Sequence, residues 1–297
     1  MMNKTNKKKI VIPAGVILII IAALFVSYLK WEPKPDPASE KFIREIVGKQ
    51  MNKEPYSLTD EDFAKITYIT ITNTKLLDIK LLEKFTNLKE FRLGLPIKRN
   101  IPKWKSILAR IGIYDTDKNI TIDLRPLENL INLKRIVIVN TQVRDIKPLV
   151  NKKNLIDLEL NNTQVSNIKP LENLTNLQNL DISGTMVSNI KPLANLTNLI
   201  TLNISRTQVS DIEPIANLTN LGQLNISNTQ VSNIKPLANL ENLQELQLVD
   251  LKVNDISALM NLKNLKFLTF GTYMFSDEQV AELLKALPNL RSNPSDL

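Results

Sequence analysis

Three acidic residues are spaced so that their carboxylates could act together: Asp157 and Glu159 lie two residues apart, and Asp181 follows 22 residues after Glu159. Three carboxylates at short range could bind Ca²⁺, which prefers oxygen ligands, and two could form the acid pair of a glycoside hydrolase. A solvated polar patch is the third interpretation. The sequence holds no His and no Cys, so the commonest general base, the commonest zinc ligand and any thiolate nucleophile are missing. We therefore expect no enzymatic activity and no cofactor, and the calcium site stays a hypothesis.

A repeat of 22 residues sets where these acids lie. From Asn129 its copies begin at residues 129, 151, 173, 195, 217, 239 and 261, and the copy at 173–194 reads NLTNLQNLDISGTMVSNIKPLA. The consensus is apolar at positions 2, 5, 8, 10, 15, 18 and 21. Alternation at positions 8 and 10 indicates a short strand, and the wider spacing elsewhere indicates turns and a tight helical return. This period with an L-x-x-L-x-L core is the signature of leucine-rich repeats, with one strand per coil.

One such coil cannot be stable alone. Burying about seven aliphatic side chains contributes roughly 10–20 kcal/mol, whereas ordering about 22 residues costs roughly 1–2 kcal/mol each for the backbone. Stacking in register supplies the missing burial. We therefore predict an α/β leucine-rich-repeat solenoid, with a parallel sheet on the concave face and short helical or 3-10 turns on the convex face.

The repeats are predicted to cover residues 62–275, with earlier coils beginning at 62 and 84 and an irregular insertion at 94–119. That insertion is either an extra coil with Trp104 in the core or a projecting segment that carries specificity. Because a finite solenoid needs polar ends, helical caps are expected at 39–61 and 276–297. The second cap opens on the N-cap pattern Ser276-Asp277-Glu278-Gln279.

Two polar positions of the repeat are expected to serve the scaffold. Thr at position 13 can hydrogen-bond turn backbone between coils; these residues are Thr141, Thr163, Thr185, Thr207 and Thr229. Asp or Asn at position 17 can cap the helical turn that follows; these residues are Asp145, Asn167, Asn189, Asp211, Asn233 and Asp255.

The N-terminus carries a membrane signal. Residues 10–29 are uncharged and mostly aliphatic, and about 20 residues of helix span the roughly 30 Å of a bilayer. We predict a cytoplasmic tail (1–9), a single transmembrane signal anchor (10–29) and a linker (30–38), with the lysines before the span keeping the N-terminus inside. The protein is then expected in the plasma membrane with its repeats outside the cytoplasm. A cleaved signal, which would make it secreted, and a buried core helix are the alternatives.

Strand positions 7, 9 and 11 should point onto the concave face, where a protein partner could bind. The candidates are Tyr68, Glu90, Arg92, Arg135, Asp157, Glu159, Asp181, Glu245, Gln247 and Phe267. Position 19 would align a basic row on the convex side, which could hold a polysaccharide or an anionic envelope polymer or could simply aid solubility; it comprises Lys80, Arg125, Lys147, Lys169, Lys191 and Lys235. Residues 1–30 carry five of the eight net positive charges, so the folded part lacks the basic bias of a nucleic-acid binder.

Residues 185–205, TMVSNIKPLANLTNLITLNIS, with the lead-in EKFIREIVGKQ (40–50) and SLTDEDFAKITYI (57–69), resemble bacterial internalin-type repeats and their helical N-terminal cap. The same 22-residue subtype occurs in regulatory subunits of protein phosphatase one. The resemblance covers about residues 39–275 and implies a binding module whose concave face meets a receptor on a host cell. The chain departs from many internalins because it lacks a C-terminal cell-wall sorting motif and a concave face lined with aromatic residues.

Overall fold

The computed structural model describes residues 36–72, 78–94, 122–271 and 274–295. The expected tail (1–9), the anchor (10–29) and most of the linker (30–38) lie outside these residues, as does nearly all of the insertion 94–119. Within the described ranges, no helix is long and apolar enough to cross a membrane. The account below concerns the unit that begins at Asp36.

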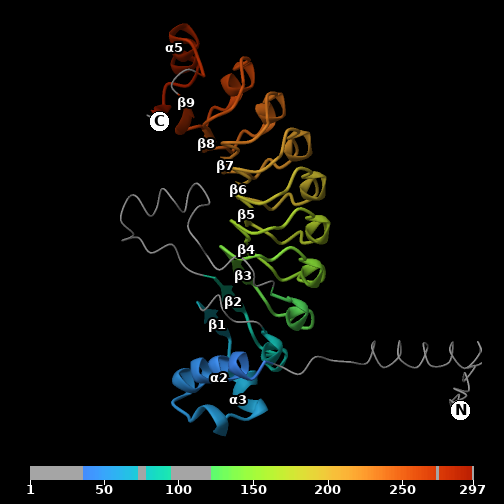
Figure 1. The fold of residues 1–297 in the computed structure, drawn as a ribbon. Helices are drawn as coiled ribbons and strands as arrows, with labels where there is room; N and C mark the ends of the chain where they lie inside the picture. The colour runs from blue at the N-terminus through green and yellow to red at the C-terminus, as the bar shows by residue number, and fades with distance from the viewer. Residues whose placement is uncertain (1–35, 73–77, 95–121, 272–273, 296–297) are drawn as a thin grey trace, which may run out of the picture. The chain divides into compact units, whose positions relative to one another are not determined.

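Ten parallel strands form one sheet in sequential order, each coil adding one strand to the last (Figure 1). The strands line the inner face of the curved stack and short 3-10 helices line its outer face, which is the predicted leucine-rich-repeat solenoid (Figure 1). The strands are β1 (Tyr68–Ile71), β2 (Glu90–Leu93), β3 (Arg135–Ile138), β4 (Asp157–Glu159), β5 (Asn179–Asp181), β6 (Thr201–Asn203), β7 (Gln223–Asn225), β8 (Glu245–Leu248), β9 (Phe267–Gly271) and β10 (Arg291–Ser295). The 3-10 helices of the coils are η2 (Lys80–Lys84), η3 (Arg125–Leu127), η4 (Lys147–Leu149), η5 (Lys169–Leu171), η6 (Lys191–Leu193), η7 (Glu213–Ile215), η8 (Lys235–Asn239) and η9 (Ser257–Asn261).

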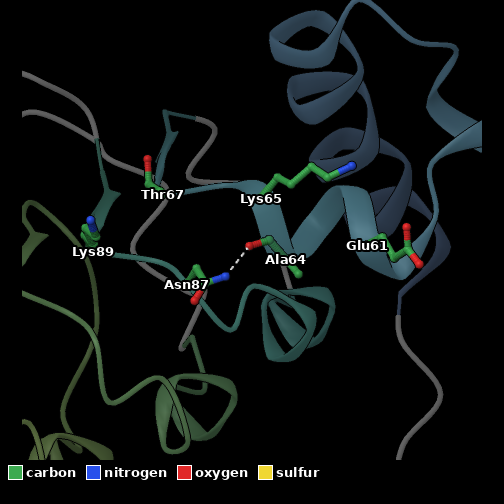
Figure 2. A pocket seen from close by; sticks show the side chains of 6 residues that line it. All are labelled: Glu61, Ala64, Lys65, Thr67, Asn87 and Lys89. Atoms are coloured by element: carbon green, nitrogen blue, oxygen red, sulfur yellow. Dashed lines mark hydrogen bonds between the residues drawn. The ribbon is translucent and has the colours of Figure 1, made fainter.

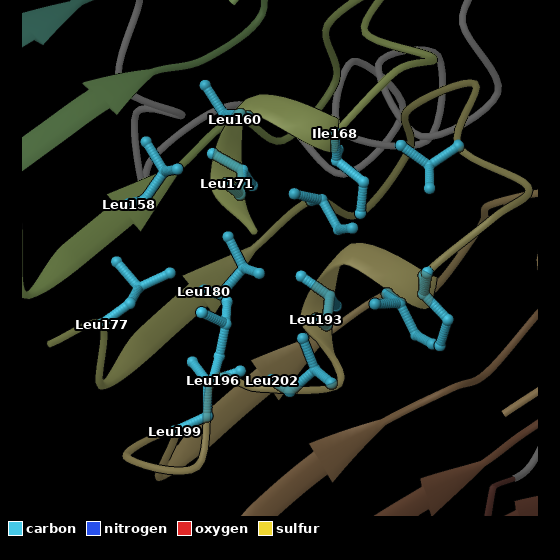
Figure 3. Close-up of a cluster of buried hydrophobic side chains, with 14 of the residues drawn as sticks. Leu158, Leu160, Ile168, Leu171, Leu177, Leu180, Leu193, Leu196, Leu199 and Leu202 are labelled. Carbon is cyan, nitrogen blue, oxygen red and sulfur yellow. The ribbon is translucent and has the colours of Figure 1, made fainter. Parts of the chain in front are cut away.

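The core is a set of aliphatic columns that run through the stack. Leu158, Leu180 and Leu202 occupy position 8 of three successive coils, pair in register across the sheet and are fully buried (Figure 3). Leu171 and Leu193 face them from η5 and η6 (Figure 3). Each fully buried leucine contributes about 1.5–3 kcal/mol, and the columns form because the period is the same in every coil.

An asparagine ladder joins the coils at position 4. Asn198 Nδ2 donates to Thr175 O of the preceding coil at 2.8 Å, and Asn220 Nδ2 donates to Thr197 O at the same distance. The same bond, reaching back 23 residues between coils of regular length, is made by Asn87, Asn154, Asn176, Asn242 and Asn264. The consensus asparagine therefore satisfies a turn carbonyl that the sheet does not reach.

The capping role of position 17 is confirmed, whereas the role expected for threonine is wrong. Asn189 Oδ1 accepts the backbone N–H of Lys191, which opens η6, at 2.9 Å. Thr185 Oγ1 donates to Ile182 O three residues earlier in its own coil, at 2.6 Å, and Thr207 does the same to Ile204 O. The acceptor is the carbonyl of the residue that directly follows the strand, so each of these hydroxyls bonds within its own coil.

The N-terminal cap combines α2 (Pro37–Met51), η1 (Pro55–Ser57) and α3 (Asp60–Lys65). Asp62 lies in the capping box of α3 with Thr59, and Lys53 Nζ lies 2.8 Å from its carboxylate. The hydrogen bond from Lys53 and then that from Thr59 N–H lower the pKa of Asp62 to about 2. Phe63 packs on Phe85 of the first coils, with ring centroids 5.3 Å apart. These contacts close the open end of the sheet.

The C-terminal end differs from the expected cap at 276–297. The helix α5 (Asp277–Ala286) begins at a capping box between Ser276 and Gln279, but Arg291–Ser295 then forms β10 beside β9. Leu287 and Leu290 are buried, and Leu290 N–H donates to Leu287 O at 3.0 Å, the bond that positions 5 and 2 make in other coils. Their spacing starts one more coil, which adds a strand where a helical end alone was expected.

Candidate functional site

The concave face brings the predicted acidic residues together as lateral neighbours. Asp157 stands opposite Asn179, and Glu159 stands opposite Asp181, on β4 and β5. Arg135 stands opposite Asp157 on the other side, on β3. The equal period of the coils places them so, because residues 22 apart occupy the same position of adjacent strands.

Arg135 is the centre of this group. Its Nη2 lies 2.6 Å from Glu159 Oε1, and its Nη1 lies 3.7 Å from Asp157 Oδ2. Asp157 also accepts a hydrogen bond from Asn179 Nδ2. Sequence spacing did not indicate this reach, because Arg135 and Glu159 occupy different repeat positions and meet only through the length of the arginine side chain.

The carboxylate of Asp181 bonds to the turn that follows its strand and to the neighbouring strand. Its Oδ1 accepts Ser183 N–H at 2.8 Å, and its Oδ2 accepts Asn203 Nδ2 at 3.2 Å. Asn203 and Asn225 make the same bond to the backbone N–H two residues on. The repeated Asp/Asn-x-Ser triplet was the signal for this turn, which sequence reasoning missed.

These bonds leave the calcium hypothesis without support. In the described parts of the chain there is no group of three or more acidic, His or Cys side chains placed to hold a metal ion. Glu159 is occupied by Arg135, and Asp181 is occupied by backbone and amide donors. The arrangement fits the solvated polar patch, and it offers no unpaired acid pair for glycoside hydrolysis.

The two ends of the concave face carry exposed aromatic rings. Tyr68 on β1 is 57% exposed and Phe267 on β9 is 46% exposed, both at position 7. Eight strand spacings of about 4.8 Å separate them, which is about 38 Å. Between them, Glu90 pairs with Arg92 along β2, and Asn225 Nδ2 donates to Gln247 Oε1 at 2.9 Å.

The convex row lies where it was expected, at the first residue of the 3-10 helices. Lys147, Lys169 and Lys191 open η4, η5 and η6 and are exposed, whereas Glu213 opens η7. Arg125 is bound to Asp123 at 2.6 Å. That contact and Glu213 interrupt the row, so it is not uniformly basic.

A depression with a volume of about 590 Å³ lies where α3 meets the first coils. Figure 2 shows Asn87 Nδ2 donating to Ala64 O at 2.9 Å, with Lys65 and Lys89 along the wall. This bond is the first rung of the asparagine ladder and fastens the cap to the repeats. The depression is wide and open, so we assign it a structural role.

Comparisons with known proteins agree on the fold. A family model described as leucine-rich repeats (2 copies) matches residues 197–239. The structure of an internalin (inlF) from Listeria monocytogenes is 28% identical, covering 85% of this chain and 74% of that chain with a TM-score of 0.68. The structure of internalin C2 (inlC2) from the same species is 30% identical, covering 79% of this chain and 93% of that chain with a TM-score of 0.65.

A plant peptide hormone receptor, RGFR1 in complex with RGF2, is 17% identical, covering 76% of this chain and 35% of that chain with a TM-score of 0.57, and shows a shared fold. A search of curated protein sequences gives no match.

Proposed function

Because this chain belongs to the internalin-like family of bacterial leucine-rich-repeat proteins, we propose that it is a non-enzymatic binding module that holds a protein partner on its concave face, outside the cytoplasm. The fold is typical of protein–protein interaction modules. The observation that carries the proposal is the continuous polar sheet with an exposed aromatic ring at each end, Tyr68 and Phe267.

The size and chemistry of this face suit a protein. A span of about 38 Å is wide enough for a standard interface, which buries about 800 Å² on each partner. Trp, Tyr and Arg dominate binding energy at such interfaces, and Tyr68 and Arg135 lie on this face. Arg135 already holds Glu159 and Asp157, so it is fixed before a partner arrives and loses little side-chain freedom on binding.

The location outside the cytoplasm rests on the N-terminal apolar segment 10–29 and the lysines that precede it. We propose a plasma-membrane anchor there, with secretion as the result if the segment is cleaved. Protease added to intact spheroplasts should degrade the repeats, and the membrane fraction should keep residues 1–29. Protection of the repeats in intact spheroplasts, with degradation only after the membrane is permeabilised, would contradict this orientation.

Site-specific photo-crosslinking tests the binding face. A crosslinking amino acid at position 179 on the concave sheet should capture a partner, and the same group at the exposed convex position Ser188 should not. With the captured partner purified, Tyr68→Ala and Phe267→Ala should each weaken its binding by about tenfold, or about 1.4 kcal/mol. Tyr56→Ala is the matched control, because Tyr56 is 73% exposed on the N-terminal cap and lies outside the sheet. Capture from position 188 alone would refute the concave site.

The alternative was an envelope scaffold or adhesin that grips polysaccharide or anionic polymer along the whole convex row. The row is interrupted by the ion pair between Arg125 and Asp123 and by the acidic residue Glu213. These interruptions weaken the case for a polymer bound along the whole row. Binding along a continuous row would be lost steeply as salt rises, and a salt titration of polymer binding measures this.

A further inference from the structure

The charge of the convex side depends on position 17 as much as on the basic row at position 19. The cap of each 3-10 helix needs one side-chain oxygen, and Asp and Asn supply it equally: Asp145 Oδ1 and Asn167 Oδ1 accept the N–H of Lys147 and Lys169 at 2.9 Å in both cases. The group that remains is an anionic oxygen in Asp and an NH₂ donor in Asn. The choice between them therefore changes the surface charge and leaves the cap intact.

When the charges at positions 17 and 19 of each coil are added, most coils are neutral or acidic on the convex side. The pairs are Asp78 with Lys80, Asp123 with Arg125, Asp145 with Lys147, and Asp211 with Glu213. Asn233 with Lys235 is a single basic pair, because the same two positions carry Asp211 with Glu213 in the coil before it and Asp255 with Ser257 in the coil after it. Two adjacent coils differ, since they pair Asn167 with Lys169 and Asn189 with Lys191. Within the described residues, neither of these two lysines forms an ion pair.

The same two coils enclose a groove. It lies between η5 and η6, has a volume of about 500 Å³ and is lined by both Asn–Lys pairs, with Ser166 and Glu172 among its other walls. This volume is in the range of sites for small ligands, about 300–1,000 Å³. Two ammonium groups, four asparagine amides and a hydroxyl make it rich in donors.

We propose that this groove binds a phosphodiester-linked polyol chain, with one phosphate held between Lys169 and Lys191. Lysine binds phosphate as a point charge, while amide and hydroxyl groups can donate to the remaining oxygens. The lining residues include no arginine, so an anion in the groove is held by the point charges of the two lysines and by single hydrogen bonds from the amides and the hydroxyl. With Glu172 the groove carries a net charge of +1, which equals the single negative charge of a phosphodiester.

The flanking coils confine the ligand to this groove. On one side Asp211 and Glu213 carry negative charges that repel an anion, and on the other side the charge of Asp145 offsets that of Lys147 in the same coil. The groove also lacks aromatic side chains on which nucleic-acid bases could stack, which favours a polyol over RNA. This site lies on the side opposite the concave sheet and stands independently of the proposed protein partner.

The test is binding of a glycerol-phosphate oligomer to the full chain in neutral detergent, measured by titration calorimetry. Asn167→Asp with Asn189→Asp keeps both caps and adds two negative charges, and we expect binding to fall at least about tenfold. Asn233→Asp is the matched control, because Asn233 caps η8 in the same way, at 3.0 Å, away from the groove, and its binding should equal that of the wild type. Lys169→Gln with Lys191→Gln should also lose binding, and thermal melting checks that each variant is folded.

Three results would overturn the proposal. The proposal is wrong if the glycerol-phosphate oligomer does not bind the wild-type protein. It is also wrong if the variant with Asn167→Asp and Asn189→Asp binds the oligomer as tightly as the wild type does. Polygalacturonate or single-stranded RNA binding as tightly as the glycerol-phosphate oligomer would show that the groove does not recognise a polyol phosphate.

Discussion

Lys152 occupies a core position that every regular coil nearby gives to leucine. It stands at position 2, where Leu130, Leu174 and Leu196 are buried, and its own side chain is fully buried. Its Nζ donates to Glu128 O at 2.7 Å. Burial lowers the pKa of Lys152, and the nearby Glu128 carboxylate offsets this only in part. The charged form is therefore less favourable in the folded protein than in water.

We predict that Lys152→Met stabilises the protein. Replacing buried charged groups by apolar residues of similar volume is neutral or stabilising by about 1–4 kcal/mol. Losing the hydrogen bond to the Glu128 carbonyl reduces this gain. A net gain of about 1–2 kcal/mol should raise Tm by about 2–8 °C, as measured by circular dichroism.

The pH dependence separates this cause from better packing. The folded-state pKa of Lys152 lies below its ordinary value of 10.5, so between the two values the unfolded state binds more protons and wild-type stability rises with pH. The advantage of Lys152→Met should thus be greatest at neutral pH and shrink toward pH 10.5. Lys153→Met, at an exposed neighbour, is the control and should change stability by less than about 0.5 kcal/mol. A less stable Lys152→Met at every pH would show that the hydrogen bond outweighs desolvation.

Three further predictions follow from the scaffold. Leu180→Ala should destabilise the protein by about 2–5 kcal/mol in denaturant unfolding, because it opens a cavity in a column buried on both sides. Asn198→Ala should cost about 0.5–1.5 kcal/mol, because it removes one rung of the ladder; no loss would mean that water replaces the rung fully. Asp62→Asn should make the free energy of unfolding depend less on pH in the acid range. The Asp62 carboxylate, with a pKa of about 2, stabilises the fold above pH 3.8, and that contribution is lost as pH falls toward 2. Acid unfolding curves of the two proteins measure this difference.

The period of the sequence predicted the features that depend on register alone. Glu159 and Asp181 were expected side by side, and they are, because one constant period fixes every lateral pair. The bond from Arg135 to Glu159 was not predictable in this way, since it joins two repeat positions through a long side chain. The prediction that the threonine hydroxyls bond between coils was wrong. The sequence pattern does not indicate which of two nearby carbonyls lies closer to the hydroxyl. β10 was missed because its coil lacks the consensus and keeps only Leu287 and Leu290.

The repeat also explains how such a chain can acquire a site without loss of stability. At position 17 the fold needs one oxygen acceptor, which Asp255 and Asn233 supply to the following helix at 2.9 and 3.0 Å. Either residue stabilises the turn, so selection for stability alone does not decide between them. At position 2 the fold needs an apolar side chain, and the departure at Lys152 carries a cost. The Asn residues at 167 and 189 therefore cost the scaffold nothing, and they leave Lys169 and Lys191 without an acidic residue at position 17 of their own coils, on the surface that the proposed groove uses.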